Sequence, residues 1–522
     1  MVTVKRALLS CHDKTGLDEF AAALAQLGVE LVASGGTAEF LTKRGLRVTT
    51  VETFAGIAEQ LDGRVKTLHP KIHGGILARR DDTAHVQAVG AEGLIDLVVV
   101  NLYPFQQAIQ RPQVSLPEAI EQIDIGGVAL LRAAAKNFAH VGAVSDSAQY
   151  APVAEALQRG QGRLPEALAK QLAVSAFQLT SAYDTLISRY LASTNGPTPS
   201  STEREADALP DEVSLTLRRR QPLRYGENPH QRGGWYVETG ASAWGLGTLC
   251  QHQGKELSYN NLLDIDAALR CLLEFEEPTC AIIKHHSQCG LAGGIGIREA
   301  YEQAHACDPE SAFGGIVGFN RPLDGATAYQ LTGTFLEVIV APSVDDQAVR
   351  VFGSKSNLRV VTLTWPAPRP AGWAWRQLLG GWALQEFDAR AEEPGAFQVA
   401  TRRAPTARER ADLLFAWKAA KHALSNGIVI ASSLATRGIG QGQPSRVGSV
   451  RLAIEKAGSR SRNAVAASDG FFPFPDSIEL LAKAGITAVI QPGGSIRDRE
   501  VISAADDARM SMLLTSTRHF RH

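Results

Sequence analysis

The chain has 522 residues, too many for one hydrophobic core, so about two to four domains are expected. Its 53 basic and 54 acidic residues give a formal net charge of −1, and no charged tail indicates a nucleic-acid or membrane partner. The six cysteines are scattered without a CxxC pair, which argues against a zinc site and against a disulfide framework. The sequence shows neither a secretory signal core nor an apolar run of membrane-spanning length, so a reduced cytoplasm is the expected location.

The first part of the chain alternates short apolar runs with segments of helical spacing. Residues 7–9, 30–33 and 97–100 are apolar runs of strand length, and the segments 17–27 and 38–43 have helical periodicity. This alternation predicts an α/β fold with a doubly wound parallel sheet.

A segment rich in Ser, Thr, Pro and charged residues, 194–210, predicts a linker. The predicted domains are therefore 1–193 and 211–522. The second is about twice the size of a typical domain and is expected to contain two α/β subdomains that meet near residue 370.

Several turns of the first predicted domain suit an anionic substrate. Residues 34–37, Ser-Gly-Gly-Thr, lie between a strand and a helix, where free N–H groups attract anions, although a tight turn explains the glycines equally well. The segment 63–75 is dense in cationic, hydroxyl and histidine side chains, which favours a phosphate and oxyanion cradle over a solvated loop. Asn101 and Tyr103 follow a buried strand and would lie at the carboxyl edge of the sheet. Asp124 precedes a helix, where capping is its commoner role.

In the second domain, Lys284 and His285 end the apolar run 281–283 and precede the turn-rich stretch 286–290. This pattern predicts a buried strand that ends in a loop at a ligand-binding sheet edge. Histidine is the usual general base near neutral pH, and a neighbouring ammonium stabilises an oxyanion. Taken alone, the pair is more often a solvated lysine beside a hydrogen-bonded histidine.

Motifs elsewhere in the chain favour a catalytic role for this pair. They resemble the motifs of one enzyme family and occur in the same order along the chain. The blocks that resemble its inosinate cyclohydrolase half are 13–16, 32–37, 64–70, 101–105 and 121–127. The blocks that resemble its transformylase half are 224–231, 258–262, 311–315, 438–443, 468–474 and 518–520. The family is that of the bifunctional transformylase and cyclohydrolase enzymes of purine biosynthesis, and the resemblance spans essentially the whole chain.

The resemblance implies two reactions. A formyl group passes from 10-formyltetrahydrofolate to aminoimidazole carboxamide ribotide (AICAR), and formyl-AICAR then closes with loss of water to inosine monophosphate (IMP). It also implies a methylglyoxal-synthase-like first domain, two cytidine-deaminase-like subdomains in the second, small-molecule substrates, no catalytic metal and a homodimer.

For formyl transfer, the resemblance makes His285 the base, and Lys284 would support the oxyanion, the histidine or the leaving nitrogen. Asn426 would hold the formyl group, and Asp476 would lie near the folate. The implied substrate-binding positions of this half are Arg224, Tyr225, Asn261, Gly314, Glu337, Phe471 and Arg518.

For ring closure, the resemblance makes Asp124 the acceptor of the carboxamide proton. Lys66 would stabilise the oxyanion, and Tyr103 and Lys136 would hold the substrate. The implied substrate-binding positions of this half are Lys14, Ser34, Gly35, Gly36, Thr37, Arg64, Thr67, Asn101, Gly126 and Gly127.

Three residues depart from the family pattern: His12 stands for serine, Gln288 for proline and Ser432 for lysine. The ring of His12 is expected to alter the phosphate end of the cyclohydrolase pocket. Gln288 is expected to loosen the loop that carries the base.

Three other functions are weaker. A methylglyoxal-synthase-like phosphate enzyme leaves the second half unexplained. A regulatory nucleotide-binding protein does not need the retained Lys66, Asp124, Lys284 and His285. A cytidine-deaminase-like zinc enzyme needs a His/Cys cluster, which the dispersed cysteines do not provide.

Overall fold

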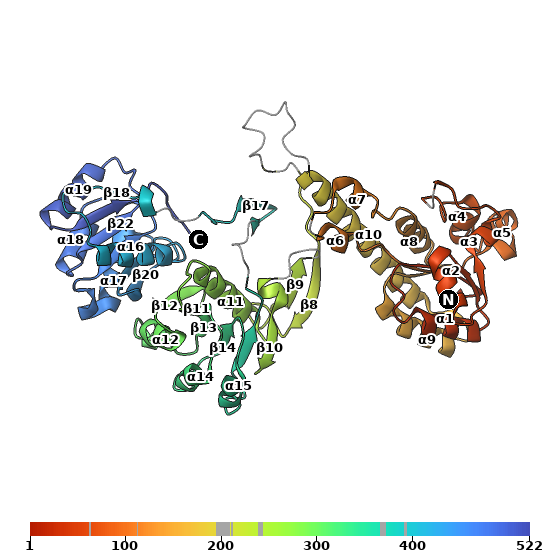
Figure 1. Ribbon diagram of the computed structural model, residues 1–522, viewed down its shortest axis with the longest axis horizontal. Coiled ribbons are helices and arrows are strands. Elements are labelled where there is room, and N and C mark those ends of the chain that lie inside the picture. Colours follow the sequence, from red (N-terminus) through yellow and green to blue (C-terminus); the bar gives the residue numbers. More distant parts are fainter. Residues whose placement is uncertain are drawn as a thin grey trace. The chain divides into compact units, whose positions relative to one another are not determined.

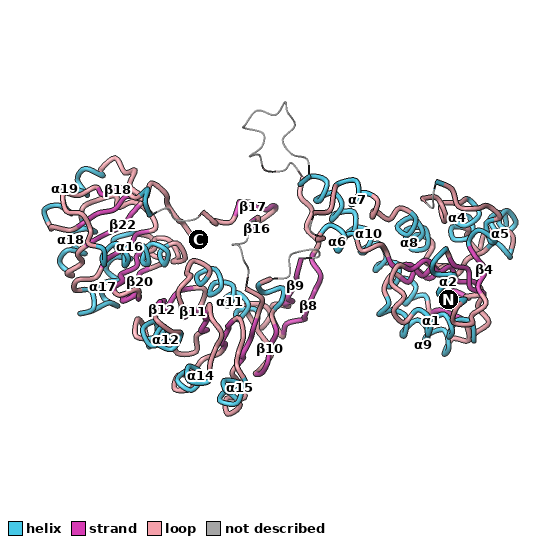
Figure 2. Tube along the Cα trace, in the orientation of Figure 1, coloured by secondary structure: helices cyan, strands magenta, loops and turns pink. Residues whose placement is uncertain are grey.

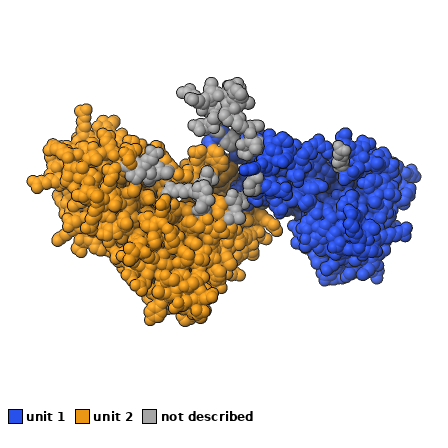
Figure 3. All heavy atoms as spheres, viewed as in Figure 1, with its two compact units in different colours: residues 1–217, 238–240 blue, residues 218–237, 241–522 orange. Residues whose placement is uncertain are grey.

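The computed structural model describes residues 1–61, 64–111, 113–194, 209, 212–238, 244–365, 372–390 and 394–522. The chain divides into two compact units, residues 1–217 with 238–240 and residues 218–237 with 241–522 (Figure 3). Most of the predicted linker 194–210, and the predicted subdomain boundary near residue 370, lie outside the described residues. Among the helices that the structure describes, none is both long enough and apolar enough to cross a membrane.

The first unit contains a parallel sheet whose described strands follow the order β4-β3-β2-β5-β6 (Figure 1). These strands are β2 Arg6–Cys11, β3 Glu30–Ala33, β4 Val48–Thr50, β5 Leu97–Asn101 and β6 Gly142–Val144. The helices are α1 Leu17–Gln26, α2 Gly35–Thr42, α3 Val51–Ala55, α4 Pro70–Leu77, α5 Thr83–Val89, α6 Phe105–Ile109, α7 Leu116–Ile120, α8 Gly126–Lys136, α9 Tyr150–Arg159 and α10 Glu166–Thr194. The short strands β1 Val2–Thr3 and β7 Arg163–Leu164 pair separately.

Alternate side chains of the strands enter two cores on opposite faces of this sheet. Leu9 and Val99 pack with α1 and α9, whereas Leu8 and Val98 pack with α4, α8 and α10. Figure 2 shows α1 and α9 on one side of this sheet and α8 on the other. Strands that are buried on both faces explain the continuous apolar runs in the sequence. The predicted doubly wound parallel sheet is confirmed.

The second unit contains a twelve-stranded sheet among its described residues, in the order β10-β15-β14-β13-β11-β12-β20-β19-β21-β22-β23-β18. The strands are β10 Cys250–Gln253, β11 Thr279–Lys284, β12 Ser287–Gly293, β13 Ile316–Phe319, β14 Val338–Ala341, β15 Arg359–Thr362, β18 Gln398–Val399, β19 Ile428–Ser432, β20 Ala435–Gly440, β21 Val465–Ser468, β22 Ala488–Gln491 and β23 Ser511–Leu514. The helices are α11 Tyr259–Leu272, α12 Ile297–His305, α13 Pro309–Ala312, α14 Gly325–Leu331, α15 Asp346–Phe352, α16 Ala407–Ala420, α17 Arg446–Ala457, α18 Asp476–Lys483 and α19 Asp498–Asp507. Two further hairpins are β8 Leu217–Leu223 with β9 Gly233–Glu238, and β16 Trp373–Leu378 with β17 Gly381–Glu386.

The large sheet consists of two repeats of one element order: a helix, a β-hairpin, a helix, and then three parallel strands with helices between them. The first repeat begins at α11 and the second at α16. Each hairpin turns through two residues of positive φ, at 285–286 and 433–434. In each repeat an aspartate of the first helix accepts a hydrogen bond from the second turn N–H: Asp264 from His286 at 2.7 Å, and Asp412 from Leu434 at 2.8 Å.

Strand directions decide which ends meet. β11 is antiparallel to β12 and β13, β12 to β20, and β19 to both β20 and β21. The carboxyl ends of β11 and β20–β23 therefore share one edge with the amino ends of β12–β15 and β19. We call this the β11 edge, and the opposite side, where β19 ends, the β19 edge.

Candidate active sites

The carboxyl edge of the first sheet is organised by Asn101 at the end of β5. Its Oδ1 accepts hydrogen bonds from the backbone N–H groups of His12 at 2.6 Å and Asp13 at 2.9 Å, and its Nδ2 donates to the Asp13 carbonyl at 2.8 Å. Lys14 Nζ donates to the carbonyls of Cys11 and His12. Asn101 thus fixes the turn after β2, and the Lys14 ammonium lies over the strand ends.

A glycine-containing turn lies at the N-terminus of α2. Ser34 is its N-cap residue, and the Ser34 and Ser10 hydroxyls are 2.8 Å apart. A Cβ built on Gly35 would lie 3.6 Å from Lys66 Nζ, so this ammonium stands directly over the turn. Lys66 also pairs with Glu59 at 2.7 Å. Free backbone N–H groups, the helix dipole and an ammonium together favour a bound anion.

Asp124 is held beside this edge at the start of α8. Its Oδ1 accepts from the Gly127 N–H at 2.7 Å, and the Asp124 N–H donates to the Tyr183 hydroxyl at 2.9 Å. Burial raises the pKa of the Asp124 carboxyl above its ordinary value of 3.8. A carboxylate with a raised pKa binds a proton more tightly, so it is a stronger base than a solvated carboxylate.

Two glycines allow this close packing. A Cβ on Gly127 would lie 2.6 Å from Asp124 Oδ2, and a Cβ on Gly126 would lie 2.8 Å from Thr67 Oγ1. Thr67 is buried there, so the segment that carries Lys66 packs against the helix that Asp124 caps. Because these two glycines have no side chains, Asp124 and Thr67 can approach the backbone of α8 closely.

Three predicted positions of this domain have other surroundings. Lys136 lies in the last turn of α8, about 15 Å of helix from Gly126, and is exposed, so the structure does not bring it to Asp124. The Thr37 hydroxyl is buried and exchanges hydrogen bonds with the backbone of Cys11, so it serves the fold. Arg64 is exposed and pairs with Glu121.

In the second unit, Lys284 and His285 lie at the β11 edge. The predicted buried strand is confirmed, since residues 279–283 of β11 are buried. The predicted loop at 286–290 is wrong, because β12 begins at Ser287 after a two-residue turn. His285 and His286 have φ of 52° and 60°, and two residues of positive φ make the tight turn that joins twisted strands. The sheet edge at which Lys284 ends β11 also contains the amino ends of β13–β15.

A polar network continues from this pair along the β11 edge. Lys284 Nζ donates to the Phe313 carbonyl at 2.7 Å, and Gly314, with φ of 72°, follows directly. The Gly315 carbonyl accepts from the Glu337 N–H at 3.0 Å. Lys284, Gly314 and Glu337 are thereby brought together.

Glu337 joins a second group of predicted residues. Its Oε2 accepts from Asn261 Nδ2 at 3.0 Å and lies 3.8 Å from Arg359 Nη1. Arg224 lies 4.7 Å from the centroid of the Tyr225 ring. Burial lowers the pKa of the Arg359 guanidinium, Glu337 opposes this shift, and the nearby charge of Arg224 adds to it. Two guanidinium groups at one edge suit an anionic substrate.

Asn426 comes to the β11 edge from the second repeat, just before β19. Its Oδ1 accepts from Arg446 Nη2 at 2.8 Å, and its Nδ2 donates to the Gln443 carbonyl at 2.9 Å. Arg446 is buried, donates to Ser468 Oγ at 2.8 Å and pairs with Asp469. These contacts fix the orientation of the amide.

The His285 hairpin and the Asn426 segment are tied together by glutamines. Gln441 Nε2 donates to the Gln288 carbonyl at 2.9 Å, and Gln441 Oε1 accepts from the Leu424 N–H at 3.3 Å. Gln288 is buried in β12, and its own amide donates to a carbonyl of α16 at 3.0 Å. The expectation that Gln288 loosens this segment is wrong, because the amide anchors it.

The other predicted positions of the second unit lie at its surface or end of chain. Asp476 is exposed at the first residue of α18, and its carboxylate accepts from the Ser477 N–H at 2.7 Å. Phe471 is 41% exposed, and the Arg518 guanidinium lies 4.6 Å from the Phe520 ring centroid. These exposed side chains can contact a ligand.

Two arginines at the β11 edge, Arg359 and Arg446, were not predicted from the sequence. Arg359 is the first residue of β15, and Arg446 the first of α17. Neither belongs to a local motif that indicates a ligand. Only the pairing of distant segments brings each of them to the β11 edge.

Comparisons with known proteins identify the family to which the chain belongs. Residues 16–129 match the MGS-like domain, and residues 134–456 match the family described as AICARFT/IMPCHase bienzyme. The chain belongs to the AICARFT/IMPCHase bienzyme family. It is a bifunctional enzyme of purine biosynthesis, with AICAR transformylase and IMP cyclohydrolase activities, which confirms the function predicted from the motifs.

Relatives of this bienzyme match along nearly the whole chain. The bifunctional purine biosynthesis protein PurH of Synechococcus elongatus is 48% identical over 522 residues and 99% of both chains. PurH of Listeria monocytogenes is 46% identical over 521 residues, 99% of this chain and 100% of that one. A solved structure named "Crystal structure of ForH" is 36% identical, covers 35% of this chain and 97% of its own, and has a TM-score of 0.33.

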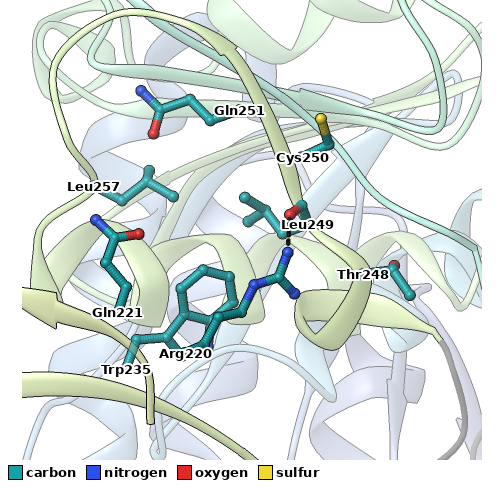
Figure 4. Close-up of a pocket in the computed structure, with 8 residues that line it drawn as sticks. All are labelled: Arg220, Gln221, Trp235, Thr248, Leu249, Cys250, Gln251 and Leu257. Atoms are coloured by element: carbon teal, nitrogen blue, oxygen red, sulfur yellow. Dashed lines mark hydrogen bonds between the residues drawn. The ribbon is translucent and has the colours of Figure 1, made fainter. Parts of the chain in front are cut away.

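A cavity of about 340 Å³ in the second unit of the bienzyme is lined by none of the predicted site residues (Figure 4). The Arg220 guanidinium there donates to the Leu249 carbonyl at 2.7 Å and lies 4.7 Å from the Trp235 ring centroid, so its charge serves the fold. Within the described ranges, no three His, Cys, Asp or Glu side chains are grouped in a way that holds a metal ion.

Proposed function

We propose that the carboxyl edge of the first sheet closes formyl-AICAR to IMP and that the β11 edge transfers the formyl group. The observation that carries the first assignment is the half-buried carboxylate of Asp124 at the same edge as an ammonium over a helix N-terminus. The second assignment rests on the joining of Lys284, Asn261 and Glu337 by one polar network.

Ring closure needs a base and a group that stabilises negative charge. Asp124 takes the proton of the carboxamide nitrogen as this nitrogen attacks the formyl carbon, and it returns that proton to the oxygen of the adduct. The carbinolamine then loses this hydroxyl and the proton of the former formamide nitrogen as water, which forms the C=N bond of IMP. Lys66 stabilises the oxygen that becomes negative. The turn at Ser34–Gly36 receives the phosphate, with Lys14 and Thr67 near it. Both reacting groups belong to one molecule, so positioning supplies much of the rate gain.

Formyl transfer needs a base for a weakly nucleophilic amine. His285 takes the proton of the AICAR amino group as this nitrogen attacks the formyl carbon, and Lys284 stabilises the tetrahedral oxyanion. The oxyanion collapses with cleavage of the bond to the folate nitrogen, which leaves with the proton that His285 held. Asn426 donates its remaining amide N–H to the formyl oxygen. Arg224 and Arg359, with Tyr225, Asn261 and Glu337, bind the nucleotide.

The cosubstrate we propose is 10-formyltetrahydrofolate; the family uses a folate in general. Phe471 and Asp476 lie exposed where a flat ring system would be bound. Neither step as written requires a metal. The remaining proposals are a cytoplasmic location and a homodimer, for which the hairpin β16–β17 offers exposed apolar surface: Leu379 is fully exposed and Trp382 is 60% exposed.

A fragment that ends at Thr194, the last residue of α10, tests the division of labour. The purified fragment is expected to convert supplied formyl-AICAR to IMP without folate. The full chain is expected to form IMP from AICAR and 10-formyltetrahydrofolate. A folded fragment that is inactive beside an active full chain would refute the assignment of ring closure to residues 1–193.

A further inference from the structure

The connection between α16 and β19, residues 421–427, carries Asn426, the residue proposed to hold the formyl group. Backbone outside helices and strands has no regular hydrogen-bond partners, so its conformation depends on contacts from elsewhere. Arg521 supplies two such contacts. Its Nη1 donates to the His422 carbonyl at 2.8 Å, and its backbone carbonyl accepts from the Ser425 N–H at 2.8 Å. One residue therefore bridges both ends of the backbone that leads to Asn426.

The segment that contains Arg521 also supports the other side of Asn426. The His519 N–H donates to the Asp469 carbonyl at 3.1 Å, and the Asp469 N–H donates to the Gly427 carbonyl at 3.1 Å. Asp469 is buried and pairs with a guanidinium that donates to Asn426 Oδ1 at 2.8 Å. The residues before and after Asn426 are thus both connected by hydrogen bonds to this segment.

His519 anchors the segment in the interior of the second unit. Its side chain is buried, its ring centroid lies 5.1 Å from that of Trp417 in α16, and its Nδ1 lies 2.5 Å from Asp388 Oδ2. Arg521 follows two residues later, and its guanidinium binds a carbonyl just after the C-terminus of α16, where the helix dipole favours a cation. The position of this guanidinium is therefore fixed by the fold.

We propose that Arg521 is a positioning residue of formyl transfer, which holds the backbone at 422–425 so that the amide of Asn426 faces the formyl oxygen. The orientation matters because this amide must meet the oxygen as negative charge develops on it. A displacement of about 1 Å in such a group can lower the rate about a hundredfold. The inference rests on the proposed role of Asn426.

The first test is Arg521→Met in the full chain, which removes the guanidinium and keeps a flexible side chain. The kcat of formyl transfer is expected to fall about ten- to a hundredfold. The KM for AICAR is expected to change by less than about twofold, because the lost positioning acts in the transition state. Ring closure of supplied formyl-AICAR is expected to be unchanged. Arg521→Lys, whose ammonium can bind the same carbonyl, is expected to lose less activity.

A double-mutant cycle with Asn426→Ala tests whether Arg521 acts through Asn426. In the Asn426→Ala background, Arg521→Met is expected to change kcat by less than about twofold, because the amide that it positions is already absent. A purely structural role of Arg521 would lower kcat by the same factor in both backgrounds. If Arg521→Met does not fold, Arg521→Lys takes its place in the cycle.

Arg220→Met is the matched control, because the Arg220 guanidinium also donates to a backbone carbonyl, that of Leu249 at 2.7 Å, in a cavity lined by none of the proposed site residues. It is expected to keep the wild-type kcat. An unchanged kcat in Arg521→Met, equal losses in the two methionine variants, or losses that multiply in the double variant would overturn the inference. Full formyl transfer by Asn426→Ala would instead refute the proposed role of Asn426, and the inference with it.

Discussion

Substitution of Asp124 by asparagine separates a general base from a helix cap. The Gly127 N–H donates to Asp124 Oδ1 at 2.7 Å, and an amide oxygen accepts this bond equally well. Burial raises the pKa of the carboxyl in the folded protein, so the ionised form is less favourable there than in the unfolded chain. The neutral amide avoids that cost, and the variant is expected to unfold at the wild-type temperature or slightly above it.

The sign of the pH effect follows from the same shift. A folded pKa above the unfolded value of 3.8 stabilises the wild type most below that value, and this contribution is lost as the pH rises through the folded pKa. The thermal midpoint of Asp124→Asn relative to the wild type is therefore expected to increase from acidic to neutral pH.

The effect on catalysis is much larger. A positioned base contributes about a hundredfold to ten-thousandfold in rate, so ring closure in Asp124→Asn is expected to fall at least a hundredfold. Thermal midpoint and IMP formation from supplied formyl-AICAR are to be measured on one preparation. A folded variant with a normal rate would show that Asp124 is a cap and no base.

Three further results are expected. His285→Asn should lower formyl transfer at least about a hundredfold and leave ring closure intact, because asparagine tolerates the positive φ of 52° but cannot act as the base. Ser433→Asn, in the equivalent turn with φ of 53°, should not lower formyl transfer. Equal losses in the two variants would show that the effect comes from the conformation of the turn. Lys66→Ala should lower the rate of ring closure by about a hundredfold or more. Glu59→Gln removes the carboxylate that lies 2.7 Å from the Lys66 ammonium, and it should preserve ring closure. Similar losses in the two variants would show that the Lys66–Glu59 ion pair has a structural role. Gln288→Ala should lower the free energy of unfolding by about 1 to 3 kcal/mol in denaturant titrations, because it removes a buried hydrogen bond. An unchanged free energy of unfolding would show that Gln288 does not anchor this segment.

The sequence predicts the first unit well because its signals are local. Continuous apolar runs such as 97–100 occur in strands that helices cover on both faces, and here those runs form the centre of the sheet. The second unit is harder. The stretch 286–290 contains polar residues and a glycine, which resemble a loop, yet pairing with β11 makes Ser287–Gly293 a strand. Tertiary pairing overrides the local composition there.

The candidate site residues also differ in whether a local sequence motif predicts their position. Residues in dense motifs, such as Lys66 and Asn101, lie at the edge where the pattern predicts them. Lys136 does not, because a helix of eleven residues carries it to the far end from Asp124. Arg359 and Arg446 have no local signal, because their surroundings come from strands distant in the sequence.

The duplication explains why residues of both repeats meet at one edge. β12 and β20 pair antiparallel at the centre of the sheet, so the hairpin of one repeat lies at the edge where the other repeat begins its β-hairpin. The β11 edge therefore combines His285 from the first repeat with Asn426 from the second. At the β19 edge the equivalent turn carries Ser433, and Ser432 Oγ accepts from Arg437 Nε at 2.9 Å. The departure at Ser432 thus lies on the edge without the proposed chemistry, where Arg437 supplies a cation from within the sheet.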